Sequence, residues 1–205
     1  MSLIFGWLCF LVQSPVVNAE ETAWLWWGYQ QHNMALTYFS TILAYLGGTP
    51  MMGVLVLLIS ALAYKKQRIE LSIFSILAFG GIVAIGWFFK ELIARPRPEI
   101  WEQMAPYYGY SFPSNHSAYA MVFAGILVIV SADSAWQKFA IICAVLWCCV
   151  MGLSRMYLGA HFPTDVLGGF SLGLGWLCLL TWLFIRFNIF QHRASTIAGN
   201  HEVKL

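Results

Sequence analysis

Long apolar segments are the feature that most constrains the fold of this chain. Six of them cover residues 1–17, 34–64, 71–94, 114–131, 139–157 and 163–187. A helix needs about 20 apolar residues to cross a bilayer, and most of these segments reach or approach that length. Only 10% of the residues are charged, which leaves too little polar surface for a soluble all-α protein. The sequence therefore predicts an all-α, polytopic membrane protein with six transmembrane helices.

The N-terminal region has two possible interpretations. Val17 and Ala19 resemble the small-residue pattern of a signal-peptidase site, but no basic residue precedes the apolar segment. We therefore expect an uncleaved first membrane helix. Residues 20–33 follow it and are rich in Trp, which favours the membrane–water interface, so a short interfacial helix is predicted there. We treat residues 1–205 as one membrane-embedded domain.

Several classes of function find no support in the composition. The net charge is only +2 and no basic block occurs, so no nucleic-acid partner is expected. The five cysteines lie within apolar segments, at spacings that fit neither a disulfide framework nor a metal cluster. No cluster of carboxylates offers ligands for magnesium or zinc, so we expect neither a metal nor another cofactor. The oligomeric state is left open.

The basic residues fall into two groups. If the N-terminus lies in the cytoplasm, seven of the eleven Lys and Arg residues fall in cytoplasmic loops or in the tail, as the positive-inside rule requires. The other four are Lys90, Arg95, Arg97 and Arg155, which lie at or near outward ends of predicted helices. Because the rule disfavours basic residues there, a function should retain them.

Three junctions between predicted helices reach this outer face, in residues 90–98, 112–117 and 154–165. The topology gathers seven polar side chains from them at one membrane level: Lys90, Arg97, Ser114, His116, Arg155, His161 and Asp165. Ionisable residues close to membrane segments are costly and usually functional. The sequence therefore predicts one polar site at this face.

The residue types in this site suit phosphoryl chemistry. Three fixed cations attract a polyanion, and arginine offers a planar fork to phosphate oxygens. Ser114 stands at a predicted helix start, where its hydroxyl and the free N–H groups bind anions. His161 and Asp165 are four residues apart, so the carboxylate can orient the ring and leave its other nitrogen to attack. His116 is then available to protonate the leaving oxygen.

Three motifs within residues 90–165 carry a resemblance to a known family. They are K-x6-R-P at 90–98, P-S-N-H at 113–116 and S-R-x5-H-x3-D at 154–165. In order and spacing they resemble the type 2 phosphatidic acid phosphatase superfamily, which also includes glucose-6-phosphatase and the vanadium haloperoxidases. The six-span layout extends the resemblance over most of the chain.

The resemblance implies a metal-independent phosphatase. His161 would be the phosphohistidine nucleophile, with Asp165 orienting it and His116 acting as the general acid. The phosphate-binding residues that it implies are Lys90, Arg97, Ser114 and Arg155. The family usually has glycine where this chain has Asn115. Asparagine tolerates positive φ better than most residues, so we expect its backbone N–H to keep a contact with phosphate.

Arg95 lies outside these motifs and has two interpretations, as a lipid-headgroup anchor or as a contact to a second phosphate. We expect a lipid substrate, because the site lies at helix ends and can be entered from the bilayer. The chain resembles a bacterial protein, so a multi-pass protein of the inner (plasma) membrane is expected, with its site facing the periplasm or exterior. By family analogy the substrate is undecaprenyl diphosphate, hydrolysed to undecaprenyl phosphate.

Alternatives to this function remain. Phosphatidylglycerophosphate, phosphatidic acid and lipid A are the other candidate substrates. A lipid phosphotransferase would use the same phosphohistidine with an alcohol in place of water as the acceptor. A non-catalytic lipid binder or transporter needs no nucleophile, so the intact histidine pair argues against it.

Overall fold

The computed structural model describes residues 2–99, 108–132 and 134–190, which form eight α-helices and no strand within those ranges. The helices are α1 (Ser2–Leu11), α2 (Pro15–Tyr29), α3 (Met34–Leu46), α4 (Thr49–Lys65), α5 (Ile69–Ile93), α6 (Asn115–Val130), α7 (Gln137–Tyr157) and α8 (Pro163–Arg186). The predicted all-α class is confirmed.

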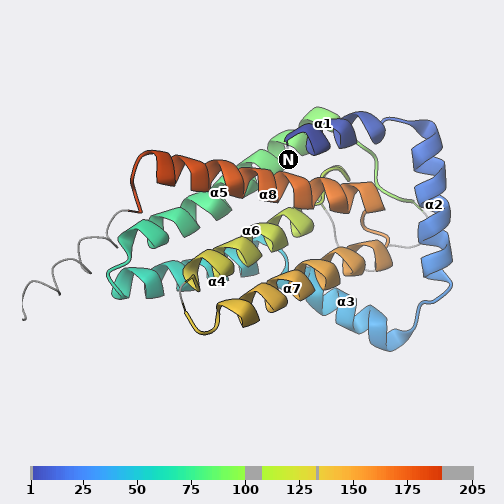
Figure 1. The fold of residues 1–205 in the computed structure, drawn as a ribbon. Helices are drawn as coiled ribbons and strands as arrows, with labels where there is room; N and C mark the ends of the chain where they lie inside the picture. The colour runs from blue at the N-terminus through green and yellow to red at the C-terminus, as the bar shows by residue number, and fades with distance from the viewer. Residues whose placement is uncertain (1, 100–107, 133, 191–205) are drawn as a thin grey trace, which may run out of the picture.

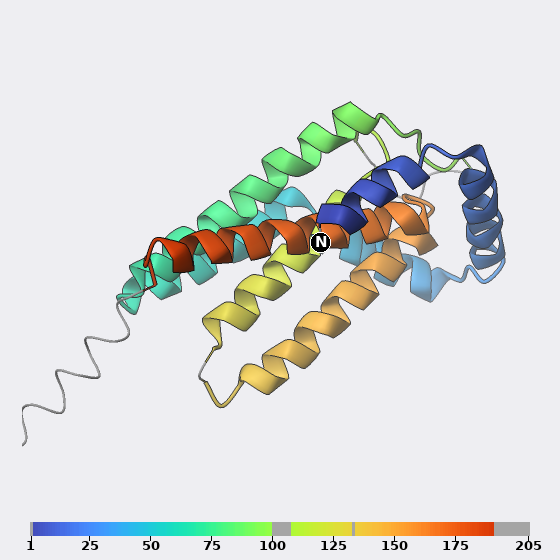
Figure 2. The same cartoon turned by 45° about the horizontal axis from the view of Figure 1, so that its top comes forward.

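Helices α4 to α8 run roughly along one long axis, with α6 packed against α5, α7 and α8 (Figures 1 and 2). Phe74, Tyr119 and Ile126 belong to the buried apolar core between them. Glycine allows the closest approach: a Cβ on Gly169 of α8 would lie 2.3 Å from the carbonyl oxygen of Ser114. Small residues at helix interfaces let backbones touch in this way. The contact fixes α8 against the start of α6.

The six expected spans are not all present as single helices. By length and composition α5, α7 and α8 could each cross a membrane, and the number rises to five if the bent pairs α1–α2 and α3–α4 each count as one. The single helix predicted over residues 1–17 is wrong, because Pro15 begins a new helix at 89° to α1. Segment 34–64 is divided near Gly47, with a bend of 57°. Helix α6 has 16 residues, which is short for a full crossing.

Helix α2 lies across one end of the bundle (Figure 1). An interfacial helix was predicted over residues 20–33, and the observed helix begins earlier, at Pro15, and ends at Tyr29. The side chains of Trp24, Trp26 and Trp27 are exposed on it. Amphipathic aromatic rings of this kind suit a membrane–water boundary.

The two ends of the bundle carry different groups. The α4–α5 turn, the α6–α7 turn and the end of α8 lie at one end, whereas α2 and the α5–α6 and α7–α8 connections lie at the other (Figure 1). Lys65, Lys66 and Arg68 are at the first end, as the basic-residue pattern predicts. Between the ends, large apolar side chains such as Leu57 and Trp182 are exposed, which suits contact with lipid.

Candidate active site

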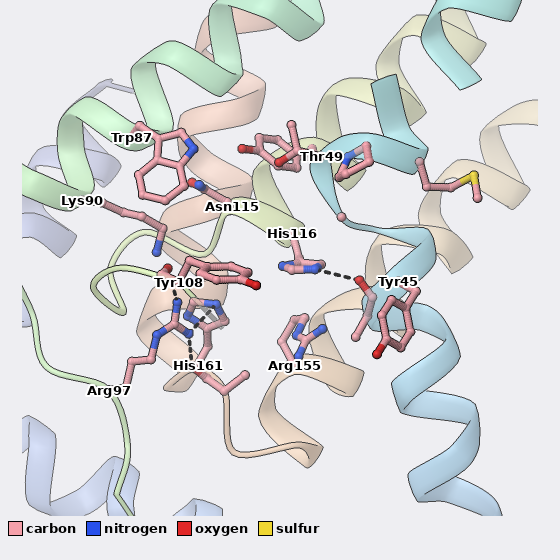
Figure 3. A pocket seen from close by; sticks show the side chains of 16 residues that line it. Tyr45, Thr49, Trp87, Lys90, Arg97, Tyr108, Asn115, His116, Arg155 and His161 are labelled. Atoms are coloured by element: carbon pink, nitrogen blue, oxygen red, sulfur yellow. Dashed lines mark hydrogen bonds between the residues drawn. The ribbon is translucent and has the colours of Figure 1, made fainter. Parts of the chain in front are cut away.

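A cavity of about 490 Å³ lies at the end of the bundle that carries α2. Its walls come from the α3–α4 bend, α5, the α5–α6 loop, the start of α6, the end of α7 and the α7–α8 connection (Figure 3). Six of the eight residues predicted for the site line it: Lys90, Arg97, Asn115, His116, Arg155 and His161. The three helix junctions that topology placed at one level thus meet around a single space.

Lys90 lies in the last turn of α5, and its buried ammonium group holds the following loop. Its Nζ donates to the carbonyl oxygens of Tyr110 and Ser111. The chain leaves α5 through Ala94, which has a left-handed φ of +49°, and then enters the Arg-Pro-Arg-Pro segment, where proline prevents the helix from continuing. This break brings Arg97 back toward the cavity.

Arg97 ties the α5–α6 loop to the α7–α8 connection. Its guanidinium donates to the carbonyl oxygens of Gly109 at 2.9 Å, Tyr108 at 3.0 Å and Ala160 at 2.8 Å. Its Nη1 also lies 3.4 Å from Nε2 of His161 (Figure 3). A fixed cation therefore stands beside the histidine nitrogen that faces the cavity.

The other nitrogen of His161 faces Asp165. Nδ1 lies 3.6 Å from Oδ2 of Asp165 and 3.5 Å from Oγ of Ser111. The same Oδ2 accepts hydrogen bonds from the Ser111 hydroxyl at 2.5 Å and from the backbone N–H of Phe162 at 2.8 Å. Asp165 is fully buried behind the ring. This arrangement orients Nδ1 toward the carboxylate and leaves Nε2 for the cavity.

Burial of His161 lowers the pKa of its ring well below the usual value, and the positive charges of Arg97, Lys90 and Arg155 lower it further. Both causes disfavour the imidazolium form. His161 is therefore neutral at physiological pH, which is the form that can attack an electrophile.

His116 is the second residue of α6 and contributes to the same cavity. Its Nε2 lies 3.0 Å from the carbonyl oxygen of Ala44, near the end of α3. Figure 3 shows His116, Arg155 and His161 around one space. With Nε2 donating to Ala44, Nδ1 is the nitrogen available to exchange a proton with a bound molecule.

Two predicted residues do not line the cavity. Asp165 lies behind His161, as an orienting residue would. Ser114 is buried at the N-cap of α6, where its Oγ accepts hydrogen bonds from the Ser117 hydroxyl at 3.1 Å and from the Ser117 backbone N–H at 3.4 Å. The structure thus assigns the Ser114 hydroxyl to a helix cap rather than to the cavity wall.

Asn115 enters the site in a different way from the one expected. It is the first residue of α6, and its φ is not among the positive values found, so its tolerance of positive φ is not used. Its side chain fills space that Gly86 of α5 leaves free: a Cβ on Gly86 would lie 2.6 Å from Oδ1 of Asn115. Asn115 therefore narrows the cavity next to α5.

Three residues around the site have roles that the sequence did not predict. Both interpretations of Arg95 are wrong, because it is only 3% exposed and its guanidinium binds Asp165 and Glu21 within the protein. The Ser111 hydroxyl bridges toward Asp165 and His161. A signal for Glu21 was present, since it and its neighbour Glu20 are the only Asp, Glu, Lys or Arg residues among the first 64.

Known proteins resemble this chain in sequence. The family model described as the PAP2 superfamily matches residues 69–189. Phosphatidylglycerophosphatase B of Bacillus subtilis is 32% identical over 139 residues, which cover 65% of this chain and 68% of that protein. Undecaprenyl-diphosphatase of Sulfolobus acidocaldarius is 28% identical over 127 residues, covering 58% of this chain and 57% of that protein. The chain spans about half the length of the lipid A 1-phosphatase of Rhizobium etli, at 30% identity over 118 residues, which are 53% of this chain and 47% of that protein.

Solved structures resemble it as well. The crystal structure of a transmembrane PAP2-type phosphatidylglycerolphosphate phosphatase from Bacillus subtilis matches with a TM-score of 0.83 and 28% identity, covering 90% of this chain and 94% of that one. Aquifex aeolicus LpxE shares the fold, with a TM-score of 0.63 at 24% identity over 78% of this chain and 93% of that one.

The family match and the apolar helices together describe a multi-pass membrane protein. The matched range 69–189 includes all three motifs and every residue predicted for the site. The resemblance drawn from the motifs is confirmed, and the chain belongs to the PAP2 superfamily.

Proposed function

We propose that this protein is a metal-independent lipid phosphatase that removes a phosphate from a membrane lipid through a phosphohistidine intermediate. One observation carries the proposal: two histidines and three cations converge on a single cavity. The cations are Lys90, Arg97 and Arg155. A doubly charged phosphoryl group suits such a set, and the neutral His161 suits its attack.

The cavity also reaches the apolar outside of the bundle. Met51 of α4 and Trp87 of α5 both line it, and they are 41% and 39% exposed. An opening between these helices would admit a phosphorylated headgroup while its acyl chains stay in lipid. This geometry supports a lipid substrate over a soluble phosphate ester.

The proposed reaction has two steps. In the first, Nε2 of His161 forms a bond to phosphorus while the bond from phosphorus to the lipid oxygen breaks. His116, protonated on both ring nitrogens at the start of this step, gives that oxygen the proton from Nδ1. Asp165 stabilises the positive ring, and the three cations neutralise the phosphoryl oxygens. In the second step, water attacks the phosphohistidine, His116 takes up a proton, and inorganic phosphate leaves with His161 restored.

Replacing His116 with alanine should slow the reaction of a poor leaving group much more than that of a good one. We expect the first-step rate with a lipid phosphate to fall by about 10²- to 10⁴-fold, the usual contribution of general acid catalysis. With 4-nitrophenyl phosphate the loss should be far smaller, because nitrophenolate leaves without a proton. Burst kinetics with both substrates measure this, and His32→Ala, a histidine outside the cavity wall, is the matched control. Equal losses with both substrates would remove His116 from the acid role.

The candidate substrates are undecaprenyl diphosphate, phosphatidylglycerophosphate, phosphatidic acid and lipid A. The sequence favoured undecaprenyl diphosphate, and the Sulfolobus relative bears the name undecaprenyl-diphosphatase. The Bacillus relatives are named for phosphatidylglycerophosphate, and the solved one matches nearly the whole chain. Phosphate release from purified protein should be compared for these two lipids, phosphatidic acid and lipid A, in the presence of EDTA. Turnover of a soluble sugar phosphate with every lipid inert would overturn the lipid assignment.

A phosphotransferase would share the first step and differ in the second. Labelled phosphate that appears in a second lipid, rather than as free inorganic phosphate, would favour the phosphotransferase. We further propose that the protein lies in a bacterial inner membrane with the cavity facing the periplasm, since the basic turns lie at the opposite end of the bundle (Figure 1).

Asn115 should tune the size of headgroup that the cavity accepts. Asn115→Gly removes the amide that fills the space beside Gly86 and widens the cavity next to α5. We expect the ratio of kcat/KM for lipid A to that for phosphatidic acid to rise by about tenfold, in the range of pocket-size effects. Asn188→Gly, beyond the end of α8, is the matched control. An unchanged ratio would exclude Asn115 from substrate selection.

A further inference from the structure

We infer that helix α2 is part of the catalytic apparatus: Glu21, acting through Arg95, positions Asp165 for its work on His161. This inference rests on the proposed function, and it concerns residues outside the three motifs. Glu21 and Arg95 do not touch the cavity, so both are positioning residues.

Arg95 bridges two buried carboxylates. Its Nη1 donates to Oδ1 of Asp165 at 2.6 Å, and its Nη2 donates to Oε2 of Glu21 at 2.7 Å. The guanidinium carbon lies 4.2 Å from the ring centre of Phe162. Glu21 is 6% exposed and Asp165 is fully buried. An ion pair this far from water is held in one geometry, and loss of one partner leaves a buried charge uncompensated.

Glu21 also caps α8. Its Oε1 accepts from the backbone N–H of Thr164 at 2.6 Å, and its Oε2 accepts from the Thr164 hydroxyl at 2.8 Å. A negative charge at a helix N-terminus is favoured by the helix dipole. Asn18, one turn before Glu21, accepts a further hydrogen bond from Arg95. Two side chains of α2 therefore hold Arg95 against the start of α8.

These contacts decide which way the Asp165 carboxylate faces. Oδ1 is held by Arg95, so the carboxylate cannot rotate, and Oδ2 remains directed at Nδ1 of His161. The Ser111 hydroxyl and the Phe162 N–H hold Oδ2 from the other side. Within the described residues, Arg95 is the cation ion-paired to this carboxylate.

The charges explain why Glu21 is needed. Glu21 and Asp165 are negative and Arg95 is positive, so the triad carries one net negative charge. The ring of His161 becomes positive when it is phosphorylated, and that net charge stabilises it. Without Glu21 the remaining pair is neutral as a whole, and the stabilisation of the charged ring weakens.

The test compares purified full-length protein in detergent with 4-nitrophenyl phosphate and phosphatidylglycerophosphate as substrates. We expect Arg95→Met to lower kcat about 100-fold, the effect of misplacing a catalytic group by about 1 Å, and Glu21→Gln to lower it about tenfold, with KM within about threefold. Arg95→Lys should restore part of the loss. Glu20→Gln, an exposed neighbour on the same helix, is the matched control and should leave kcat unchanged.

A second set of variants separates positioning from a structural role. In an Asp165→Asn background, Glu21→Gln and Arg95→Met should each lower kcat by less than about threefold further. The reason is that the effects of residues acting through one group are not additive. Fully additive losses of kcat, or a Glu21→Gln enzyme as active as Glu20→Gln, would overturn the inference. Neither result would contradict the proposed phosphatase function. If Arg95→Met does not fold, as melting in detergent would show, Glu21→Gln and Arg95→Lys decide alone. A folded wild type inactive with every phosphate ester would instead overturn the proposed function, and the inference with it.

Discussion

Replacing His161 with alanine should all but abolish phosphate release, lowering kcat by about 10⁴-fold or more with lipid and chromogenic substrates alike. The reason is the loss of the only atom proposed to bond to phosphorus, Nε2, which faces the cavity beside Arg97. The cations of the site remain, so affinity for the lipid phosphate should change little. Phosphate release by purified protein measures the first effect, and equilibrium binding of the lipid measures the second.

The assay contains EDTA throughout, and wild-type turnover should be unaffected by it. Orthovanadate should inhibit the wild type, because its trigonal-bipyramidal adduct resembles the transition state of phosphoryl transfer. His32→Ala controls for the loss of a histidine outside the cavity. Residual turnover of His161→Ala comparable to that of the wild type would show that another group attacks phosphorus and would end the phosphohistidine proposal.

The variant Gly169→Ala should lose stability and activity together. Its new Cβ would lie 2.3 Å from the Ser114 carbonyl oxygen, a backbone atom that cannot move aside without shifting the start of α6. Overpacking of this kind costs about 1–3 kcal/mol. We expect the melting temperature in detergent to fall by about 5 °C. Because α6 begins with Asn115 and His116, kcat should fall as well.

Gly80→Ala is the control for this packing effect. Gly80 lies within α5, where an added Cβ meets no atom within 4 Å, and alanine is the better helix former. Its melting temperature should equal or slightly exceed that of the wild type. Equal behaviour of the two variants would mean that α6 and α8 are farther apart than the structure has them.

Much of the fold and of the site follows from local sequence patterns. Apolar segments with few charges specify helices wherever the chain lies in lipid, because backbone polar groups must then pair internally. The three motifs assign the protein to the PAP2 superfamily. Because the motifs lie at three helix junctions, they also place Lys90, His116 and His161 at one end of the bundle. The sequence did not predict the helix break at Pro15, and the angles of 89° there and 57° near Gly47 depend on the neighbouring helices.

Such local patterns did not predict the roles of single polar groups. Ser114 stood at a helix start in the sequence, yet only the packed structure shows its hydroxyl used by Ser117. Arg95 was expected to meet a ligand and instead meets Glu21, 74 residues earlier in the chain.

By itself, the sequence determined that this protein is a helical membrane protein, which family it belongs to and which side chains gather at one end. Those properties depend on hydrophobicity and on spacing along a helix, and both are local. The tertiary structure alone decided which polar atoms pair. It tied α2 to Asp165 through Arg95, because a buried charge takes whichever opposite charge the packing brings within reach.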